Sequence, residues 1–349
     1  MRGRRSQRPD AGAAPTVPFR FVIVTLDAHL AGAFEAARAQ LRRELPALEL
    51  SLHVQADWEA DPAALARARA SIASANVIAC VQLFTEEQAA PILDVVEARR
   101  EQADAVFCAL CTGALTRQTK LGRFSMAGDA DRSPFSPLAL LKKLRGSRTD
   151  GRSSGERQMA MLRRLPALLK YVPGTAQDVR AYFLSIQYWL GGTDTNLASL
   201  VRFHVNRYAA GERAAYRDAL RVAEPEVHPE VGVWHPALPG RGIAEDARAL
   251  PVPRAATVGT VGLLVGRSYL LAGNTRHYAA VASLYAGPPT NEKPVRFTSA
   301  SIVGRSSVQA SPSRRSPKWR SIAGRASSAE ANTGSTRSPR ASSASTTAA

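Results

Sequence analysis

Three apolar stretches decide the fold: FRFVIVTL (19–26), NVIACVQLF (76–84) and DAVFCAL (104–110). Each is a continuous run rich in β-branched and aromatic residues, which is typical of a strand covered on both faces. A further strand, ELSLHV, is predicted at 49–54. The helices predicted between these strands span 30–44, 61–75 and 85–101. Strands and helices that alternate with short connections predict an α/β fold, a parallel, helix-covered, Rossmann-like sheet within 19–126.

Two of the predicted helices begin with recognisable caps. Asp61 precedes Pro62, which places a capping acid before a proline at the first helical position. Thr85 precedes two acids, whose charges favour the positive end of a helix. These signals place the starts of the second and third helices.

The next part of the chain is predicted to be mainly helical. Residues 127–155 form a loop-rich insertion with one short helix after Ser136, and 156–210 form a helical extension. Within the extension, 175–190 and 193–209 are amphipathic helices that each open with a threonine and an acid.

A second, incomplete domain is predicted after a proline-rich linker. The linker spans 211–256, and the domain begins with a strand, VGTVGLLV (258–265), and a helix, NTRHYAAVASL (274–284). We predict that this stub of a second α/β domain covers 257–287. The leader 1–18 is basic and rich in Ala, Gly and Pro, and the Ser- and Arg-rich tail 288–349 has almost no large apolar groups, so both are predicted to be disordered.

Charge, cysteines and hydropathy limit the function classes. Of the net charge of +17, the ends carry most, with +8 over 296–349 and +3 over 1–18, so the folded part has an ordinary surface and no nucleic-acid partner is predicted. Three cysteines cannot form a disulfide framework, which predicts a reducing, cytoplasmic location. No apolar run is long enough for a transmembrane helix, and the leader lacks the apolar stretch of a signal peptide.

Several short patterns invite a chemical role. Asp27 and His29 follow the first strand, where α/β sheets bind ligands, although a helix cap and a loop histidine explain them better. Cys108 and Cys111 have the spacing of a redox or zinc pair but lie at the end of a strand, which favours two packed thiols.

The segment CTGALTRQTKLGRF superficially suggests a phosphate loop. It lacks the required glycine–lysine order, so no nucleotide is predicted to bind its polar residues. Those residues are Thr112, Gly113, Thr116, Lys120 and Arg123.

Histidines and aromatic residues give no defined site. The six histidines are scattered, without a pair at helical spacing for a metal: His29, His53, His204, His228, His235 and His277. Aromatic side chains gather in the helical extension, where they could line a groove for a flat macrocycle, although a packed core is the better interpretation. They are Tyr171, Tyr182, Phe183, Tyr188, Trp189, Phe203 and Tyr208.

Longer stretches resemble a known family. FVIVTLDAHLAGA, PGTAQDVRAYFLSIQYWLGGTDTNLASLVRFHVNRYA, VGVWHP and RSYLLAGNTRHYAAV occur in the order found in the large, porphyrin-binding component of magnesium chelatase, its H subunit. KLGRF and LPALLKYVPGTAQD fit the same order, and the resemblance covers about 19–284. The cobaltochelatase large subunit is a weaker match.

The resemblance implies ATP-dependent insertion of Mg²⁺ into protoporphyrin IX in chlorophyll and bacteriochlorophyll synthesis. It implies that Mg²⁺ and porphyrin are substrates, and that two partners, the I and D subunits, form an AAA+ motor that binds the ATP. The family's chains are several times longer, so no residue here is carried over as catalytic or metal-binding, and cofactor-binding residues stay unassigned. The isolated chain is expected to be inactive. A non-catalytic porphyrin- or partner-binding fragment is one competing class, and a basic nucleic-acid-associated protein is another.

The chain's last part invites a separate explanation. After about Ser283 the amphipathic pattern stops and Ser, Arg, Ala and Pro dominate, as expected when GC-rich codons are read out of frame. We therefore expect a shifted reading frame there, with a natural low-complexity tail as the alternative.

Overall fold

The structure is a computed structural model that describes residues 17–26, 28–127, 163–251, 260–286 and 296–303. Compact units are Met1–Ser306 and Ser307–Ala349, and the second lies wholly outside the described residues. The predicted leader, the insertion helix after Ser136 and most of the predicted tail also lie outside them.

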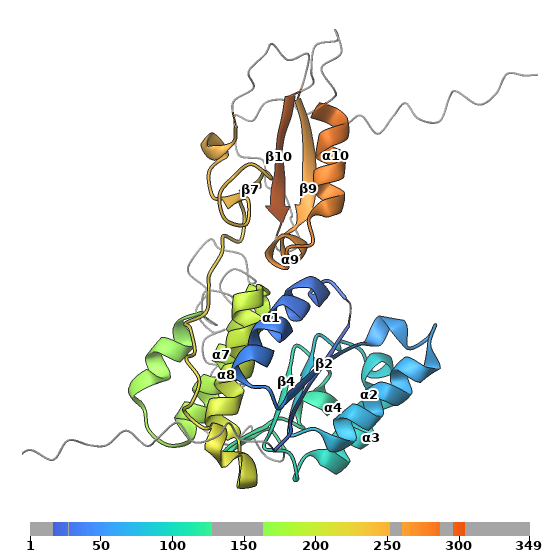
Figure 1. The fold of residues 1–349 in the computed structure, drawn as a ribbon, viewed down its shortest axis with the longest axis vertical. Helices are drawn as coiled ribbons and strands as arrows, with labels where there is room; N and C mark the ends of the chain where they lie inside the picture. Colours follow the sequence, from blue (N-terminus) through green and yellow to red (C-terminus); the bar gives the residue numbers. More distant parts are fainter. Residues whose placement is uncertain (1–16, 27, 128–162, 252–259, 287–295, 304–349) are drawn as a thin grey trace, which may run out of the picture. The chain divides into compact units, whose positions relative to one another are not determined.

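The first sheet confirms the predicted α/β character. Four strands pair in parallel in the order β2-β1-β3-β4, and a short antiparallel hairpin, β5-β6, extends the sheet beyond β4 (Figure 1). The sheet is therefore mixed but mostly parallel, and the hairpin was not predicted. The strands are β1 Phe19–Thr25, β2 Leu48–Val54, β3 Val77–Val81, β4 Ala105–Ala109, β5 Lys120–Leu121 and β6 Phe124–Ser125.

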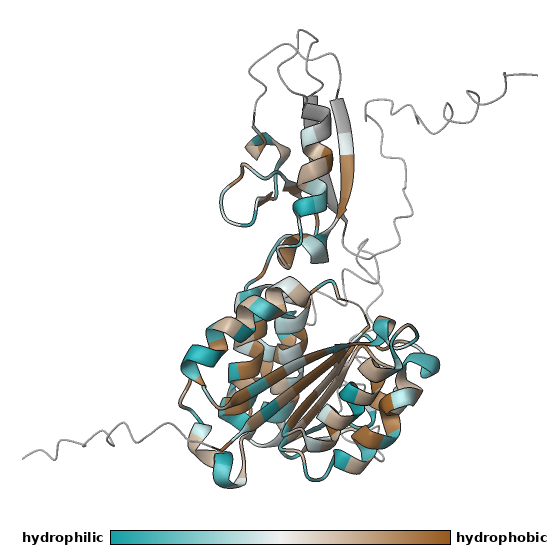
Figure 2. Cartoon of the chain, turned by 45° about the vertical axis from the view of Figure 1, so that its right-hand side comes forward, coloured by the Kyte–Doolittle hydropathy of each residue, from teal (hydrophilic) through white to brown (hydrophobic). Residues whose placement is uncertain are grey.

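Helices cover both faces of this sheet, as continuous apolar strands require. Along β1, Phe21 and Ile23 pack with α1, α7 and α8, whereas Val22 and Val24 pack with α2 and α3. Figure 2 shows these apolar strands between helices whose outer surfaces are hydrophilic. The helices are α1 Ala31–Glu44, α2 Pro62–Ser74, α3 Glu86–Arg99, α4 Gly113–Thr116, α7 Thr175–Gly191 and α8 Asp194–Tyr208, with a 3-10 turn at Gln55–Asp57.

The predicted caps are confirmed. The Asp61 carboxylate accepts from the Ala63 N–H at 2.9 Å with Pro62 at the first position of α2, and Thr85 forms a reciprocal capping box with Gln88. Thr193 caps α8, but Thr175 does not cap α7, because Gly174 occupies the capping position in a left-handed conformation (φ 77°).

The predicted start of the helical extension, 156–162, lies outside the described residues. Residues 163–168 are helical and continue into a 3-10 turn, η3, at Leu169–Tyr171. After α8 comes a second 3-10 segment, η4, at Gly211–Tyr216. The extension is thus helical over most of its described length.

The second sheet differs from its prediction. It has four strands in the order β8-β7-β10-β9, not one, and the linker supplies two of them. β10 lies within 288–349, so the prediction of no regular structure is wrong for 296–303. β10 forms through backbone hydrogen bonds with β9 and β7. Such pairing does not require alternating apolar residues, so the sequence pattern did not reveal it. The elements are β7 Val233–Trp234, β8 Ile243–Ala244, η5 Ala247–Ala249, β9 Thr260–Gly266, α9 Arg267–Leu271, α10 Arg276–Ala286 and β10 Arg296–Val303.

Candidate functional site

A polar clamp on α8 fixes the segment that builds the candidate pocket. Asn196 is fully buried; its side-chain oxygen accepts from the Glu226 N–H at 2.8 Å, and its amide donates to the Glu226 carbonyl at 3.1 Å. Thr193 donates to the Glu226 carboxylate at 3.0 Å. Gly191 makes room for this arrangement, since a Cβ there would lie 2.1 Å from the Asn196 amide nitrogen. The sequence Gly-Gly-Thr-Asp-Thr-Asn therefore places residues 225–230 beside the end of α7.

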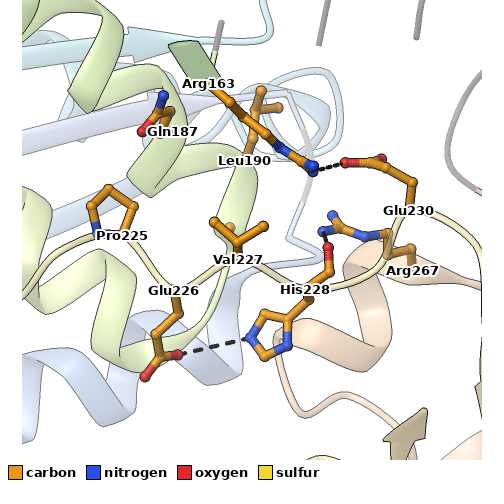
Figure 3. A pocket seen from close by; sticks show the side chains of 10 residues that line it. Arg163, Gln187, Leu190, Pro225, Glu226, Val227, His228, Glu230 and Arg267 are labelled. Carbon is orange, nitrogen blue, oxygen red and sulfur yellow. Dashed lines mark hydrogen bonds and ion pairs between the residues drawn. The ribbon is translucent and has the colours of Figure 1, made fainter. Parts of the chain in front are cut away.

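The pocket itself is lined by charged groups from three segments (Figure 3). Arg163 pairs with Glu230, and Arg267 donates to the carbonyls of Pro229 at 2.7 Å and His228 at 3.0 Å. Burial lowers the pKa of Arg267, the carboxylate of Glu230 opposing that shift. The guanidinium groups therefore brace the backbone of this segment.

His228 lines the pocket beside Glu226. Its Nε2 lies 3.8 Å from a carboxylate oxygen of Glu226, beyond hydrogen-bond distance (Figure 3). Burial lowers the pKa of His228 and outweighs the nearby carboxylate, so the imidazole is neutral at pH 7. An imidazole beside a carboxylate could accept a proton, which gives this pair in the pocket acid–base chemistry.

The size of the pocket limits its ligand. Its volume is about 40 Å³, room for roughly one to three water molecules. A tetrapyrrole macrocycle is far larger. As formed, this pocket can hold water or a small ion, and it is a braced polar site rather than a porphyrin cavity.

The residues predicted after the first strand are only partly described. Asp27 lies outside the described residues, and His29 is half-buried in the turn before α1. Among the described residues, no group of metal ligands lies at this position. Asp27 and His29 are therefore given no role.

The cysteines are packed thiols, as predicted. Cys80 and Cys108 face each other across β3 and β4, and the Cys111 thiol donates to the Cys80 carbonyl at 3.3 Å. Hydrogen bonding with Cys80, together with burial, raises the pKa of Cys108, and burial raises the pKa of Cys111 to about 12. Thiols with raised pKa values carry little thiolate and react poorly.

The polar segment after β4 serves the fold. Thr112 caps α4, and the Lys120 amine donates to the Glu101 carbonyl at 3.0 Å and its carboxylate at 3.1 Å. The Arg123 N–H donates to Asp178 at 3.0 Å, and Asp178 pairs with Arg207 at 2.7 Å. These bonds tie the β5–β6 hairpin to α7 and α8, while Gly113 and Thr116 lie within α4.

His204 is a buried core histidine. Its Nε2 lies 2.8 Å from the Ser185 hydroxyl, and the rings of Phe21, Phe107 and Phe203 surround it. Burial lowers the pKa of His204 to about 3, so it is neutral. This side chain joins α7 to α8 within the core.

The other histidines also have local structural surroundings. Burial lowers the pKa of His53 and the pKa of His235, and the ring of His235 accepts from the Ala237 N–H at 3.1 Å. The His277 ring contacts the Tyr278 ring in a tilted arrangement, with 3.9 Å between ring centres. Within the described part of the chain, no three His, Cys, Asp or Glu side chains are grouped to hold a metal ion.

The aromatic residues of the extension form core rather than a groove. Tyr182, Phe183, Tyr188 and Trp189 are buried on α7, as is Tyr208 on α8. Phe203 is partly buried, and Tyr171 is the exception at 84% exposed. Among the helices described, none is long and apolar enough to cross a membrane.

Comparison with known proteins finds similarity to parts of one family of large proteins. The family model "Domain of unknown function (DUF3479)" matches residues 20–183, and the model "CobN/Magnesium Chelatase" matches 186–309. The magnesium-chelatase H subunit of Cereibacter sphaeroides is 45% identical over 275 residues, 79% of this chain and 22% of that protein. This chain is a relative of the magnesium-chelatase H subunit.

Further relatives agree with that relationship. The H subunit of Rhodobacter capsulatus magnesium chelatase is 42% identical over 276 residues, 78% of this chain and 22% of that protein. The chloroplastic magnesium-chelatase protein ChlH of Oryza sativa subsp. indica is 33% identical over 226 residues, 61% of this chain and 15% of that protein. The chain spans about a fifth of the length of the bacterial H subunits it matches.

The family match bears on two sequence interpretations. The CobN/Magnesium Chelatase match continues to residue 309, past Ser283 and across β10. The shift in reading frame stays a prediction. The relationship to magnesium-chelatase H subunits is confirmed, and it was available from the long motif over 173–209.

Sequence reasoning missed the polar clamps of α8. Asn206 repeats the arrangement of Asn196 at an earlier point of the linker: it accepts from the Leu220 N–H at 3.0 Å and donates to the Leu220 carbonyl at 2.7 Å. Tyr188 adds a bond to the Ala223 carbonyl at 2.6 Å. The sequence signal that could have indicated them is the pair of asparagines within the predicted helix 193–209, because asparagine does not favour a helix interior. The linker is therefore held along α7 and α8 by side chains.

Proposed function

We propose that this chain supplies part of a porphyrin-binding H subunit, in the ATP-dependent insertion of Mg²⁺ into protoporphyrin IX. The observation that carries the proposal is the 45% identity over 275 residues across two consecutive family domains. In this proposal the I and D subunits are the partners and bind the ATP, and Mg²⁺ and porphyrin are the substrates. In this proposal the first sheet, which is Rossmann-like, serves as a scaffold.

The chemistry assigned to the whole enzyme is demanding. Metal insertion removes two pyrrole N–H protons and strips water from a strongly hydrated cation. Several described acids of the first domain are committed to structural pairs instead: Glu44 with Arg202, Asp104 with Arg213 and Asp178 with Arg207. This supports a positioning and docking role for the domain and an inactive isolated chain.

A titration of the 349-residue chain with protoporphyrin IX tests the proposal. Saturable quenching of porphyrin fluorescence, with displacement by deuteroporphyrin, is expected. The chain mixed with I and D subunits, ATP, Mg²⁺ and porphyrin should yield no product above blank, whereas clear turnover would contradict the inactive fragment. Failure of quenching together with salt-sensitive DNA binding would replace the proposal by the nucleic-acid alternative.

Two narrower alternatives stay within the chelatase class. A cobaltochelatase large subunit would prefer a cobalt-accepting corrinoid precursor over protoporphyrin IX in the same titration. A non-catalytic fragment that binds only partners would bind the I–D complex and leave porphyrin fluorescence unchanged. The identity to two bacterial magnesium-chelatase H subunits favours the magnesium enzyme over both.

A further inference from the structure

A second pocket, of about 320 Å³, lies within the second sheet domain. Its walls come from the loop between β7 and β8 and from the turn between α9 and α10, elements labelled in Figure 1 except for β8. Trp234, Arg241 and Thr275 supply its polar side chains. No Asp or Glu is among the described residues that line it. The pocket therefore presents hydrogen-bond donors and a positive charge.

The indole of Trp234 has an unsatisfied donor. The residue is 2% exposed and packs against Val265 and Leu270, yet within the described residues its indole N–H meets no hydrogen-bond acceptor. The indole nitrogen lies 2.9 Å from where a Cβ on Gly242 would sit, and both residues line the pocket. Unlike the indole nitrogen of Trp58, this nitrogen is not fully buried, so an acceptor that enters the pocket can reach it.

Arg241 is held at the pocket by two other groups. It donates to the Leu271 carbonyl at 3.0 Å and pairs with Asp194 on α8. A guanidinium has five N–H donors, so these contacts fix its position and leave donors for a ligand. The partial neutralisation by Asp194 limits the affinity that Arg241 can provide.

The N-terminal end of α10 completes the site. Thr275 immediately precedes the eleven-residue helix Arg276–Ala286, whose first turn carries unpaired amides and the positive end of the helix dipole. Gly240 and Gly273 have left-handed φ angles and nothing within 4 Å of where a Cβ would lie. The backbone of both loops is thus open to close approach by a ligand.

We propose that this pocket binds a small oxyanion, a carboxylate or a phosphate group. An indole N–H, a guanidinium, a hydroxyl and a helix N-terminus all favour an acceptor with negative charge. The proposal concerns this pocket and does not depend on the function proposed above. Its test accordingly needs neither porphyrin nor motor subunits.

The test is a titration of the ¹⁵N-labelled 349-residue chain, followed through the indole N–H resonances of its four tryptophans. Acetate and inorganic phosphate are added in separate titrations in exchange for chloride, at constant ionic strength. Loss of one peak in Trp234→Phe assigns that resonance. We expect it to shift saturably, with half-saturation in the millimolar range, and the anion with the lower value identifies the ligand class.

Variants distinguish binding of the anion in this pocket from a non-specific effect of added anions on the whole protein. Arg241→Gln and Thr275→Val should each weaken half-saturation at least fivefold, and Thr275→Val keeps the Arg241–Asp194 pair if the first variant fails to fold. Trp58 has a buried indole N–H without a partner and lies in the first domain's core, away from the pocket, so its resonance should stay fixed. Arg248→Gln, a change of an arginine with a 93% exposed side chain, should leave binding unchanged. A Trp234 resonance that neither anion moves, or that moves in Thr275→Val and Arg241→Gln as it does in the unaltered chain, overturns the proposal.

Discussion

The two sheets of this chain reach order by different routes. In the first sheet, β3 and β4 are completely buried and packed between two clusters of helices. In the second, the described core centres on Trp234, Val265 and Leu270, and Leu264 of β9 is 66% exposed. The first sheet is thus specified by its own apolar strands, whereas the second depends on strands borrowed from the linker and from beyond α10.

The largest effect should come from the core of the first domain. Phe107→Ala removes a fully buried ring that contacts Tyr182 and His204, and should lower the free energy of unfolding by about 3–5 kcal/mol. Leu264→Ala in the second sheet should change it by less than about 0.5 kcal/mol, since the side chain is already exposed. Urea unfolding measures both; equal losses would contradict the contrast between the sheets.

A second prediction concerns acid stability of the same core. The pKa of His204 falls to about 3 on folding, against about 6.5 in an unfolded chain. The unfolded state therefore binds more protons between these values, so stability is full above pH 6.5 and is lost as pH falls toward 3. From pH 6.5 to 4 this histidine should cost about 3 kcal/mol.

The control for that prediction is His204→Phe, which cannot titrate. Unfolding free energies are measured for both proteins from pH 7 to 4, and the difference between their slopes isolates the histidine from the acids. Parallel curves would mean that His204 is protonated or exposed in the folded chain. Ser185 loses its bond to the imidazole in this variant and keeps its bond to the Ala181 carbonyl, so only the slope is compared.

The two asparagine clamps allow a smaller, matched comparison. Asn196→Ala leaves the N–H and carbonyl of Glu226 without these partners, and should cost about 1–3 kcal/mol. Asn206→Ala removes the same pair of bonds from Leu220 at a half-buried position, so its cost should be lower. Limited proteolysis should become faster near residue 226 only in the first variant. Cleavage that is unchanged in both would mean that the clamps do not hold the linker.

These contrasts explain how far sequence alone could go. Three of the four parallel strands were predictable because each is a continuous apolar run, and β2 because its apolar and polar residues alternate. The caps Asp61 and Thr85 marked helix starts within a residue. The hairpin β5-β6 was missed because two-residue strands have no periodicity. β7, β8 and β10 were missed because their pairing is set by long-range backbone contacts.

Site prediction was less complete for a related reason. The sequence correctly assigned Cys108 and Cys111 to packing, since two thiols at the end of an apolar strand are typical of core. The clamp of Asn196 on Glu226 joins residues thirty positions apart, and no local pattern records such a bond. The unsatisfied indole of Trp234 is likewise visible only once the fold surrounds it.

The central claim, that this chain works as part of a magnesium-chelatase H subunit, is tested most directly by a chimaera. The matched region of the Cereibacter sphaeroides protein is replaced by the corresponding residues of this chain, and Mg²⁺ insertion into protoporphyrin IX is followed with the I and D subunits and ATP. The account predicts chelation within about tenfold of the parent protein. A chimaera that folds and binds porphyrin like the parent but forms no magnesium porphyrin would contradict it.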